Sequence, residues 1–456
     1  MGKLWQKQYQ VEKQIEIFTV GKDYLLDRKL VTADCTASIA HAEMLSSIGI
    51  LTTEEEKELK RGLLEIIEQQ MRGDFSISPE DEDCHTAIEN YLTEKLGESG
   101  KKIHTGRSRN DQVLAALRIY TRAFLLELQK AVLDLSRSFL SFADKHRMVP
   151  MPGRTHMQIA MPSSVGLWSA SFGEALLEDY LLLENAYRLN DQCPLGAAAS
   201  YGVPLPLDRE KVAALLGFHR VQQNVLLVNN DRGKIESIVL EAVEQVGITL
   251  SKAAEDIILF SMPEFGYFSL PRELCTGSSI MPQKQNPDLL ELVRAKAAAL
   301  SGLTVQVKNI IRSLPSGYNR DFQETKEPLL TGLQTGLDML GIVNIAVSSL
   351  TVHEEALNKG FTPDIYATDA VMEQVRSGVS FREAYRNVAG NLETLQNRDP
   401  KNSITERSAV GTPGNLGLEN STARLDDLLT TLESEKIRVE KALTSLLGRS
   451  VSILGW

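Results

Sequence analysis

The sequence predicts a mainly α-helical protein, with a bundle of long helices flanked by two smaller helical domains. Apolar side chains recur at helical spacing over several long stretches, and strand-like alternation is rare. Five of the predicted helices are at least twice the globular mean of about 11–12 residues. Helices of that length must bury their apolar stripes against partners of similar length, which favours a bundle that recruits helices from other subunits.

The first well-defined helix spans residues 52–72, with Thr52 as its cap and glutamates in its first turn. The first long helix spans residues 111–146 and is expected to be capped near Asn110. Its stripe consists of apolar side chains spaced by fours and a three: Val113, Leu117, Tyr120, Phe124 and Leu128.

Four more stretches show similar patterns, and they span residues 162–190, 231–262, 288–312 and 329–352. Pro328 leaves the start of the last helix open. Glycines and prolines after residue 353 indicate shorter helices and loops. We therefore expect an N-terminal helical domain (1–105), a central long-helix bundle (106–352) and a C-terminal helical domain (353–456).

Composition narrows the possible partners and location. The net charge of -11 over 456 residues argues against nucleic acid, which usually requires a basic face. It does not argue against an anionic substrate held by a local basic patch. No uninterrupted apolar run is long enough to span a membrane. The four scattered cysteines favour reduced thiols in a cytoplasm.

The most informative segment is the loop at residues 277–288, which lies between two predicted helices. Gly277 and Pro282 oppose regular structure. The loop presents serine hydroxyls, a lysine and an asparagine amide. These groups can take a proton from carbon and hold the carboxylate that receives the charge.

Two more segments carry candidate chemistry. Residues 101–109 hold four lysines and arginines and no acid. They form either a solvated loop or a carboxylate-binding segment, because arginine forks match carboxylate geometry. His156 lies in a turn bounded by Pro152 and Gly153. A lone histidine is more often structural than catalytic, but the titration range of its imidazole suits general acid–base catalysis.

The last segment, residues 314–328, places Gln323 and Lys326 three residues apart, on one face if the segment is helical. Alone it reads as an ordinary polar segment that leads into a helix. Together the motifs HTGRSRNDQV (104–113), TGSSIMPQKQNPD (276–288) and LPSGYNRDFQETKEP (314–328) resemble the argininosuccinate lyases, a branch of the fumarase/aspartase superfamily. The similarity runs from about residue 27 to about residue 400.

The resemblance implies cleavage of argininosuccinate to arginine and fumarate, without metal or cofactor, by a homotetramer. Ser278 would be the general base, and Lys284 and Asn286 would hold the aci-carboxylate intermediate. His156 would assist protonation of the departing guanidinium nitrogen or orient a group that does, with Glu291 as its partner.

The resemblance also implies a substrate-binding set and its distribution among subunits. Asn110 and Tyr318 would come from one chain, His156 and Asn286 from a second, and Ser278 from a third. The substrate-binding positions are Arg109, Asn110, Thr155, Asn286, Tyr318, Gln323 and Lys326.

Departures from the family pattern leave substrate identity open. Residues 6–9 differ from the family's pattern, and Arg154 replaces an aromatic residue. The family has a substrate-contacting serine near Asp27 that has no clear counterpart here; Thr19 and Gly21 lie in that area. The alternatives are a lyase for another N-substituted aspartate and a non-enzymatic use of the fold. Retention of the proposed acid, base and carboxylate-binding residues argues against the latter.

Overall fold

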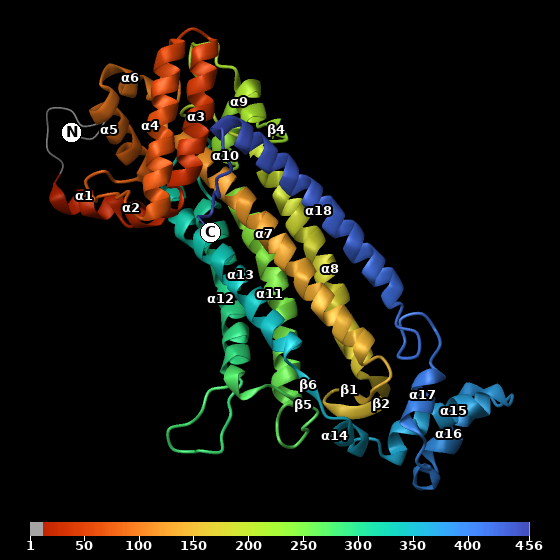
Figure 1. Ribbon diagram of the computed structural model, residues 1–456. Coiled ribbons are helices and arrows are strands. Elements are labelled where there is room, and N and C mark those ends of the chain that lie inside the picture. The colour runs from red at the N-terminus through yellow and green to blue at the C-terminus, as the bar shows by residue number, and fades with distance from the viewer. Residues whose placement is uncertain (1–11, 456) are drawn as a thin grey trace.

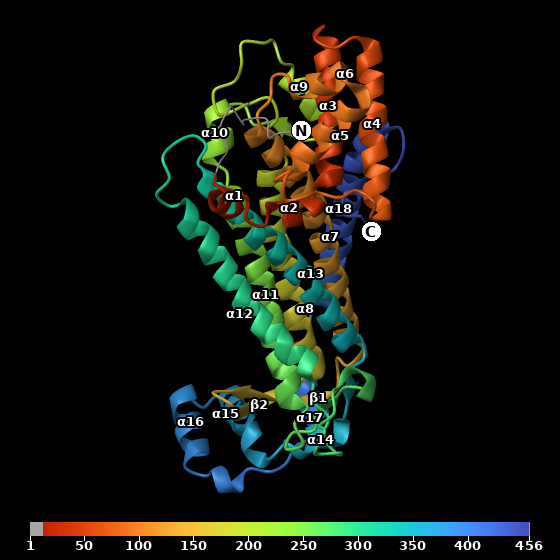
Figure 2. The same ribbon diagram turned by 90° about the vertical axis from the view of Figure 1, so that its left-hand side faces the viewer.

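The computed structural model describes residues 12–455, so the altered residues 6–9 lie outside the described part. The chain forms an elongated helical molecule (Figure 1). Helices from the first hundred residues gather at one end of a long central bundle, and short helices from the C-terminal quarter gather at the other. Figure 2 shows the same arrangement from the side. The predicted fold class is confirmed.

The central bundle contains five long helices. Helix α7 lies against α8 and α13, while α11 lies against α8, α12 and α13. The bounds are α7 Arg109–Lys145, α8 Val165–Asn190, α11 Lys234–Phe260, α12 Asp288–Ile311 and α13 Lys326–Ser348.

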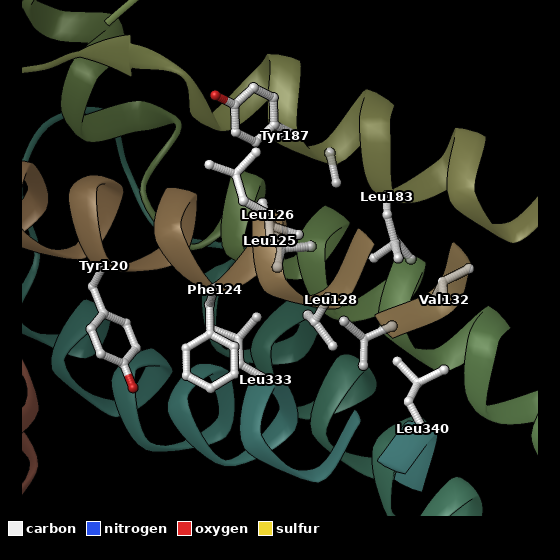
Figure 3. Packing of buried hydrophobic residues seen from close by; sticks show 14 of the residues in the cluster. Tyr120, Phe124, Leu125, Leu126, Leu128, Val132, Leu183, Tyr187, Leu333 and Leu340 are labelled. Carbon is white, nitrogen blue, oxygen red and sulfur yellow. The ribbon is translucent and has the colours of Figure 1, made fainter. Parts of the chain in front are cut away.

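Apolar stripes hold these helices together. Phe124 and Leu128 of α7 belong to one buried cluster with Leu183 of α8 and with Leu333 and Leu340 of α13 (Figure 3). Truncating a buried side chain of this size to alanine typically costs about 2–5 kcal/mol. The stripe predicted for the first long helix therefore forms part of the core.

Two glycines let α13 approach α11 closely. A Cβ at Gly332 would lie 2.3 Å from Leu240 Cδ2, and one at Gly336 would lie 2.5 Å from Val243 Cγ1. A larger residue at either position would have to displace the facing side chain, Leu240 or Val243. This part of the bundle is thus fixed by small residues as well as by apolar ones.

The N-terminal end consists of shorter helices, and the predicted helix at 52–72 is confirmed as α4. Thr52 and Glu55 form a reciprocal cap, with Glu55 N donating to Thr52 Oγ1 and Thr52 N donating to Glu55 Oε2. The bounds are α1 Lys13–Val20, α2 Asp23–Leu26, η1 Asp27–Lys29, α3 Val31–Ser47, α4 Thr53–Arg72, α5 Cys84–Leu96, α6 Glu98–Lys101 and η2 Lys102–His104.

Short elements fill the connections, including three two-stranded sheets: antiparallel β1–β2, parallel β3–β4 and antiparallel β5–β6. The strands are β1 Pro150–Thr155, β2 Gln158–Ser164, β3 Gln192–Cys193, β4 Arg220–Val221, β5 Phe268–Ser269 and β6 Thr351–Val352. The short helices are α9 Arg209–Leu215, α10 Val225–Asn230, η3 Arg272–Leu274, η4 Arg320–Thr325, α14 Glu354–Lys359, η5 Pro363–Tyr366, α15 Ala367–Arg376, α16 Phe381–Ala389, η6 Leu392–Thr394 and α17 Pro400–Thr405.

Several helix ends differ from the prediction. Helix α7 is capped by Ser108, two residues before Asn110, because the Ser108 hydroxyl accepts from Asn110 N. Helix α8 begins at Val165, since Pro162 and Ser164 belong to strand β2. Helix α13 begins at Lys326, which leaves Pro328 in the first turn, where its missing N–H is tolerated.

The largest difference is α18, Leu418–Leu447, a 30-residue helix in a region where only short helices were predicted. It runs back along α7 toward the N-terminal helices (Figure 1). The prediction of short helices holds for α14 to α17. The division into domains at residues 105 and 352 stays a prediction.

One helical stretch, Arg320–Ser348, is long and apolar enough by length and composition to cross a membrane, and the sequence analysis did not single it out. Half of its most apolar window is buried. Its helix α13 packs against α7, α11 and α12, which accounts for this composition as that of a core helix.

Candidate active site

Five predicted substrate-binding residues line one small pocket of about 50 Å³. Arg109 and Asn110 come from the first turn of α7, and Tyr318, Gln323 and Lys326 come from η4 and its flanks. The chain therefore brings together residues that are two hundred positions apart in sequence. The pocket lies at the end of the bundle that the N-terminal helices cover.

The start of α7 is fixed by buried hydrogen bonds. Ser108 N donates to Asp111 Oδ1 at 2.8 Å, and Asp111 Oδ2 accepts from Gly196 N at 2.9 Å and from Ala198 N at 2.8 Å. The first turn of a helix has unpaired N–H groups and a partial positive charge. Asn110, in that turn, therefore lies where an anionic substrate group is stabilised.

Arg109 is already engaged within the chain. Its guanidinium contacts Glu82 and Asp83, each at 3.0 Å, and donates to Thr86 Oγ1 at 3.0 Å. These contacts orient α7 against the start of α5. Direct binding of substrate by Arg109 stays a prediction, since all three of its donor nitrogens have acceptors here.

Lys326 is buried between two carboxylates. Its side chain is 2% exposed, and Nζ lies 2.6 Å from Asp27 Oδ1 and 3.0 Å from Asp23 Oδ1. Burial alone would lower the pKa of Lys326, but the charges of Asp27 and Asp23 outweigh it and raise that pKa. Lys326 thus stays cationic at the pocket wall.

The pocket also contains residues that sequence reasoning did not select. Asp23 lines it, four residues beyond Thr19 and two beyond Gly21, the positions considered for the missing serine. Arg232 lines it as well, with its guanidinium carbon 5.4 Å from the centre of the Tyr318 ring. In the sequence, Asp23 and Arg232 are distinguished only as charged residues next to the start of a helix.

Gln323 ties the pocket to the N-terminal helices. Its Nε2 donates to Thr19 O at 3.2 Å, and Arg320 donates to the same carbonyl at 2.6 Å. Thr19 therefore reaches the pocket wall through its backbone.

The predicted catalytic loop lies at the opposite end of the bundle (Figures 1 and 2). Backbone hydrogen bonds between Thr276 and Asn286, at 2.8 and 3.0 Å, close its base. The Ser278 hydroxyl oxygen accepts from Met281 N at 3.2 Å and from Ile280 N at 3.4 Å. Amide donors of this kind stabilise negative charge on an oxygen.

The other predicted residues of this region differ in exposure. Lys284 is exposed, Asn286 is half-buried, and Glu291 is exposed in the first turn of α12. The cation of Lys284 is thus available to a partner that approaches the loop.

His156 and Thr155 lie at the tip of the β1–β2 hairpin, also at the end of the bundle away from the pocket (Figure 2). Both side chains are exposed. The predicted turn at His156 is confirmed, and it is a two-residue loop because Thr155 pairs with Gln158.

One chain does not bring the three groups together. Arg232 of the pocket precedes α11, and the catalytic loop follows it. Helix α12 then runs from that loop back toward Tyr318. The 27 residues of α11 span about 40 Å at about 1.5 Å per residue. That separation exceeds the reach of any side chain.

A larger cavity of about 870 Å³ lies between α8 and α18, lined by Tyr180, Glu184, Tyr187 and Arg438 among others. None of the predicted site residues lines it. Volume alone therefore does not identify the site.

Asp27, Cys84 and His85 form a buried group whose ligand atoms lie within 4.8 Å of one another. Asp27 is paired with Lys326, and His85 Nδ1 is 2.8 Å from Asp34 Oδ2. Because these partners already occupy the polar atoms, we assign no metal to this group.

Comparison with known proteins agrees with this geometry. A family model described as lyase matches residues 7–302. An argininosuccinate lyase from Thermotoga neapolitana is 45% identical over 387 residues, which cover 85% of this chain and 97% of the relative. One from Bacteroides fragilis is 40% identical over 448 residues, covering 98% and 99%.

Solved structures share the fold. An EDDS lyase in complex with formate has a TM-score of 0.78 at 23% identity, over 96% of this chain and 95% of that one. A class II fumarase from Schistosoma mansoni has a TM-score of 0.73 at 15% identity, over 96% of each. The family match defines a lyase, and its fold is shared with a class II fumarase. Within that class, the chain belongs to the argininosuccinate lyase family, as its motifs predicted.

Proposed function

We propose that the protein cleaves argininosuccinate to L-arginine and fumarate, in arginine biosynthesis in the cytoplasm. The family supports the reaction, since relatives at 40–45% identity bear that name. The observation that carries the proposal is the pocket, in which Asn110, Tyr318, Gln323 and Lys326 gather from distant segments. Two amides and a phenol thus line a pocket with a buried cation in its wall, which suits a substrate that has three carboxylates.

The chemistry begins with removal of a poorly acidic Cβ proton, with Ser278 as the base. Electron density moves into the adjacent carboxylate, which becomes an aci-carboxylate, and Lys284 and Asn286 hold that dianion. Fixed donors aimed at developing charge are typically worth about 3–4 kcal/mol each. No step of the proposed reaction uses a metal or a cofactor.

The carbon–nitrogen bond then breaks, and the departing guanidinium nitrogen takes a proton. We assign this assistance to His156, as the acid or as the residue that orients it, with Thr155 beside it in contact with substrate. Glu291 is the proposed partner of His156. No ion pair joins the two within the described residues of one chain, so the pairing requires a second chain or a movement.

The separation of pocket, loop and hairpin supports a homotetramer with shared sites. Long helices of the bundle keep apolar side chains exposed: Leu292 is 58% and Val305 55% exposed on α12, and Ile345 is 49% exposed on α13. Exposed apolar rows on long helices favour association with other copies of the chain.

The alternative is another N-substituted aspartate as substrate, because Arg154 and residues 6–9 depart from the family's pattern. A fumarate-absorbance assay distinguishes them by comparing kcat/KM for argininosuccinate, adenylosuccinate and aspartate. We expect argininosuccinate to be preferred. A higher kcat/KM for either of the other substrates would refute the proposal.

A further inference from the structure

The hairpin that presents His156 has a costly turn. His156 and Met157 both have positive φ, 53° and 65°. A two-residue hairpin loop of this type favours asparagine and glycine, because other side chains clash there. Such residues cost of order 1–3 kcal/mol each and persist only where their surroundings hold them.

The side chain of Arg154 links this turn to the rest of the fold. Its Nη1 donates to the carbonyl of Met157 at 3.2 Å, across the loop that contains His156. Its Nη2 donates to the hydroxyl of Tyr267 at 3.4 Å. The guanidinium thus links the turn to the segment that follows α11.

The aromatic ring of Phe265 packs against the guanidinium group of Arg154. The guanidinium carbon lies 4.9 Å from the centre of the Phe265 ring, which itself packs edge-on against Tyr267 at 5.4 Å. Tyr267 is buried and contacts Phe260, the last residue of α11, at 5.7 Å. The contacts therefore run from the helix end to the turn.

The strand pairing next to Arg154 is irregular. The β1–β2 register shifts between Pro152 and Arg154, where Gly153 alone lies opposite two residues of β2, Ala160 and Met161. A Cβ at Gly153 would lie 2.7 Å from Met161 O, so this close approach of the strands requires glycine. Glycine at 153 thus lets β2 lie close to β1 directly before Arg154.

We propose that Arg154 is a positioning residue that fixes the His156–Met157 turn, and with it the direction of the His156 imidazole. The inference rests on the proposed role of His156. It explains a departure from the family pattern that otherwise bears only on substrate choice. A planar cation with two donors suits this position, whereas a lysine offers one point charge and no stacking plane.

The test compares Arg154→Ala, Arg154→Lys and a matched control, Arg137→Ala, which removes an exposed arginine of α7 that is paired with Asp426 of α18. Hydrogen–deuterium exchange in the assembled enzyme reports the turn through peptides that cover residues 155–161. We expect faster exchange there in Arg154→Ala, partial restoration in Arg154→Lys and no change in Arg137→Ala. Unchanged exchange in Arg154→Ala overturns the proposal.

Kinetics test the consequence for catalysis. A misplaced acid–base group should lower kcat by about 10- to 100-fold while KM changes little. Arg154→Ala should add nothing in a His156→Ala background, because Arg154 acts through His156. Additive losses, or a rise in KM alone, would make Arg154 a substrate ligand and overturn the proposal. Full activity of His156→Ala would instead refute the proposed role of His156, and the exchange result would then decide whether Arg154 holds the turn.

Discussion

Mixing two inactive variants tests whether the site is shared between chains. Asn110→Ala removes a pocket residue, and Ser278→Ala removes the proposed base. The pocket and the loop are joined by α11 and again by α12, of 27 and 24 residues, which span about 40 and 36 Å. Both residues can reach one substrate only if they come from different chains.

The expected recovery follows from this geometry. In equal mixtures, unfolded and refolded together, an intact pocket comes from a Ser278→Ala chain and an intact loop from an Asn110→Ala chain. Each condition holds half the time under random closed assembly, so about a quarter of the sites should be complete. The fumarate assay should show about a quarter of wild-type kcat, while each variant refolded alone stays inactive.

A matched mixture gives the opposite result. Asn110 and Tyr318 line the same pocket of one chain, so Asn110→Ala mixed with Tyr318→Ala should recover nothing. Ser278→Ala mixed with His156→Ala should recover, because the proposal assigns those residues to different chains. If the first mixture stays inactive although native mass spectrometry shows mixed tetramers, the shared site is refuted.

Three other predictions concern single residues. Ser278→Ala should lower kcat by about 10²–10⁴ with the fold intact, whereas Ser279→Ala should not; equal effects of the two in the fumarate assay would exclude Ser278 as the base. Lys284→Met should lower kcat more than it raises KM, because the charge it meets grows in the transition state; steady-state kinetics with only KM changed would contradict this. Asp27→Asn should destabilise the fold by about 3–5 kcal/mol, because it leaves Lys326 buried without its nearest carboxylate; a urea midpoint equal to wild type would show that Asp23 suffices.

Much of the fold was predictable because long helices repeat one signal many times. The helix predicted at 231–262 is α11, Lys234–Phe260, and the one at 288–312 is α12, Asp288–Ile311. Ends were less certain, since capping depends on single side chains. Ser108 caps α7 because its hydroxyl and the Asp111 carboxylate bond reciprocally with the backbone.

Helix α18 had a signal that was overlooked. Its buried residues include an apolar row at every seventh position: Leu418, Leu425, Leu432, Val439 and Leu446. That spacing predicts a long helix with one apolar seam. Glycines and prolines up to Gly417 obscured it, because they were extrapolated to the end of the chain.

The candidate site was only partly predictable for a different reason. Motifs in the chain identified the loop, the hairpin and much of the pocket, because each is a compact run of unusual residues. Asp23 and Arg232 belong to no such run and join the pocket only through the fold. Likewise, a sequence cannot show that Lys326 is buried between Asp23 and Asp27 rather than free to bind.

The length of the bundle helices gives the proposed site its geometry. A catalytic loop must be mobile enough to close over substrate. Its catalytic groups must also be placed accurately relative to the substrate, and a rigid support at the base of the loop provides that accuracy. The loop at 277–287 is held at its base by the β-bridge between Thr276 and Asn286 and at its end by the start of α12. Because α12 continues into the segment before Tyr318, each chain would offer a neighbour its loop at one end and its pocket at the other. Shortening α12 by one turn should therefore displace the loop relative to the pocket of its own chain and lower kcat in the fumarate assay; an unchanged kcat would contradict this.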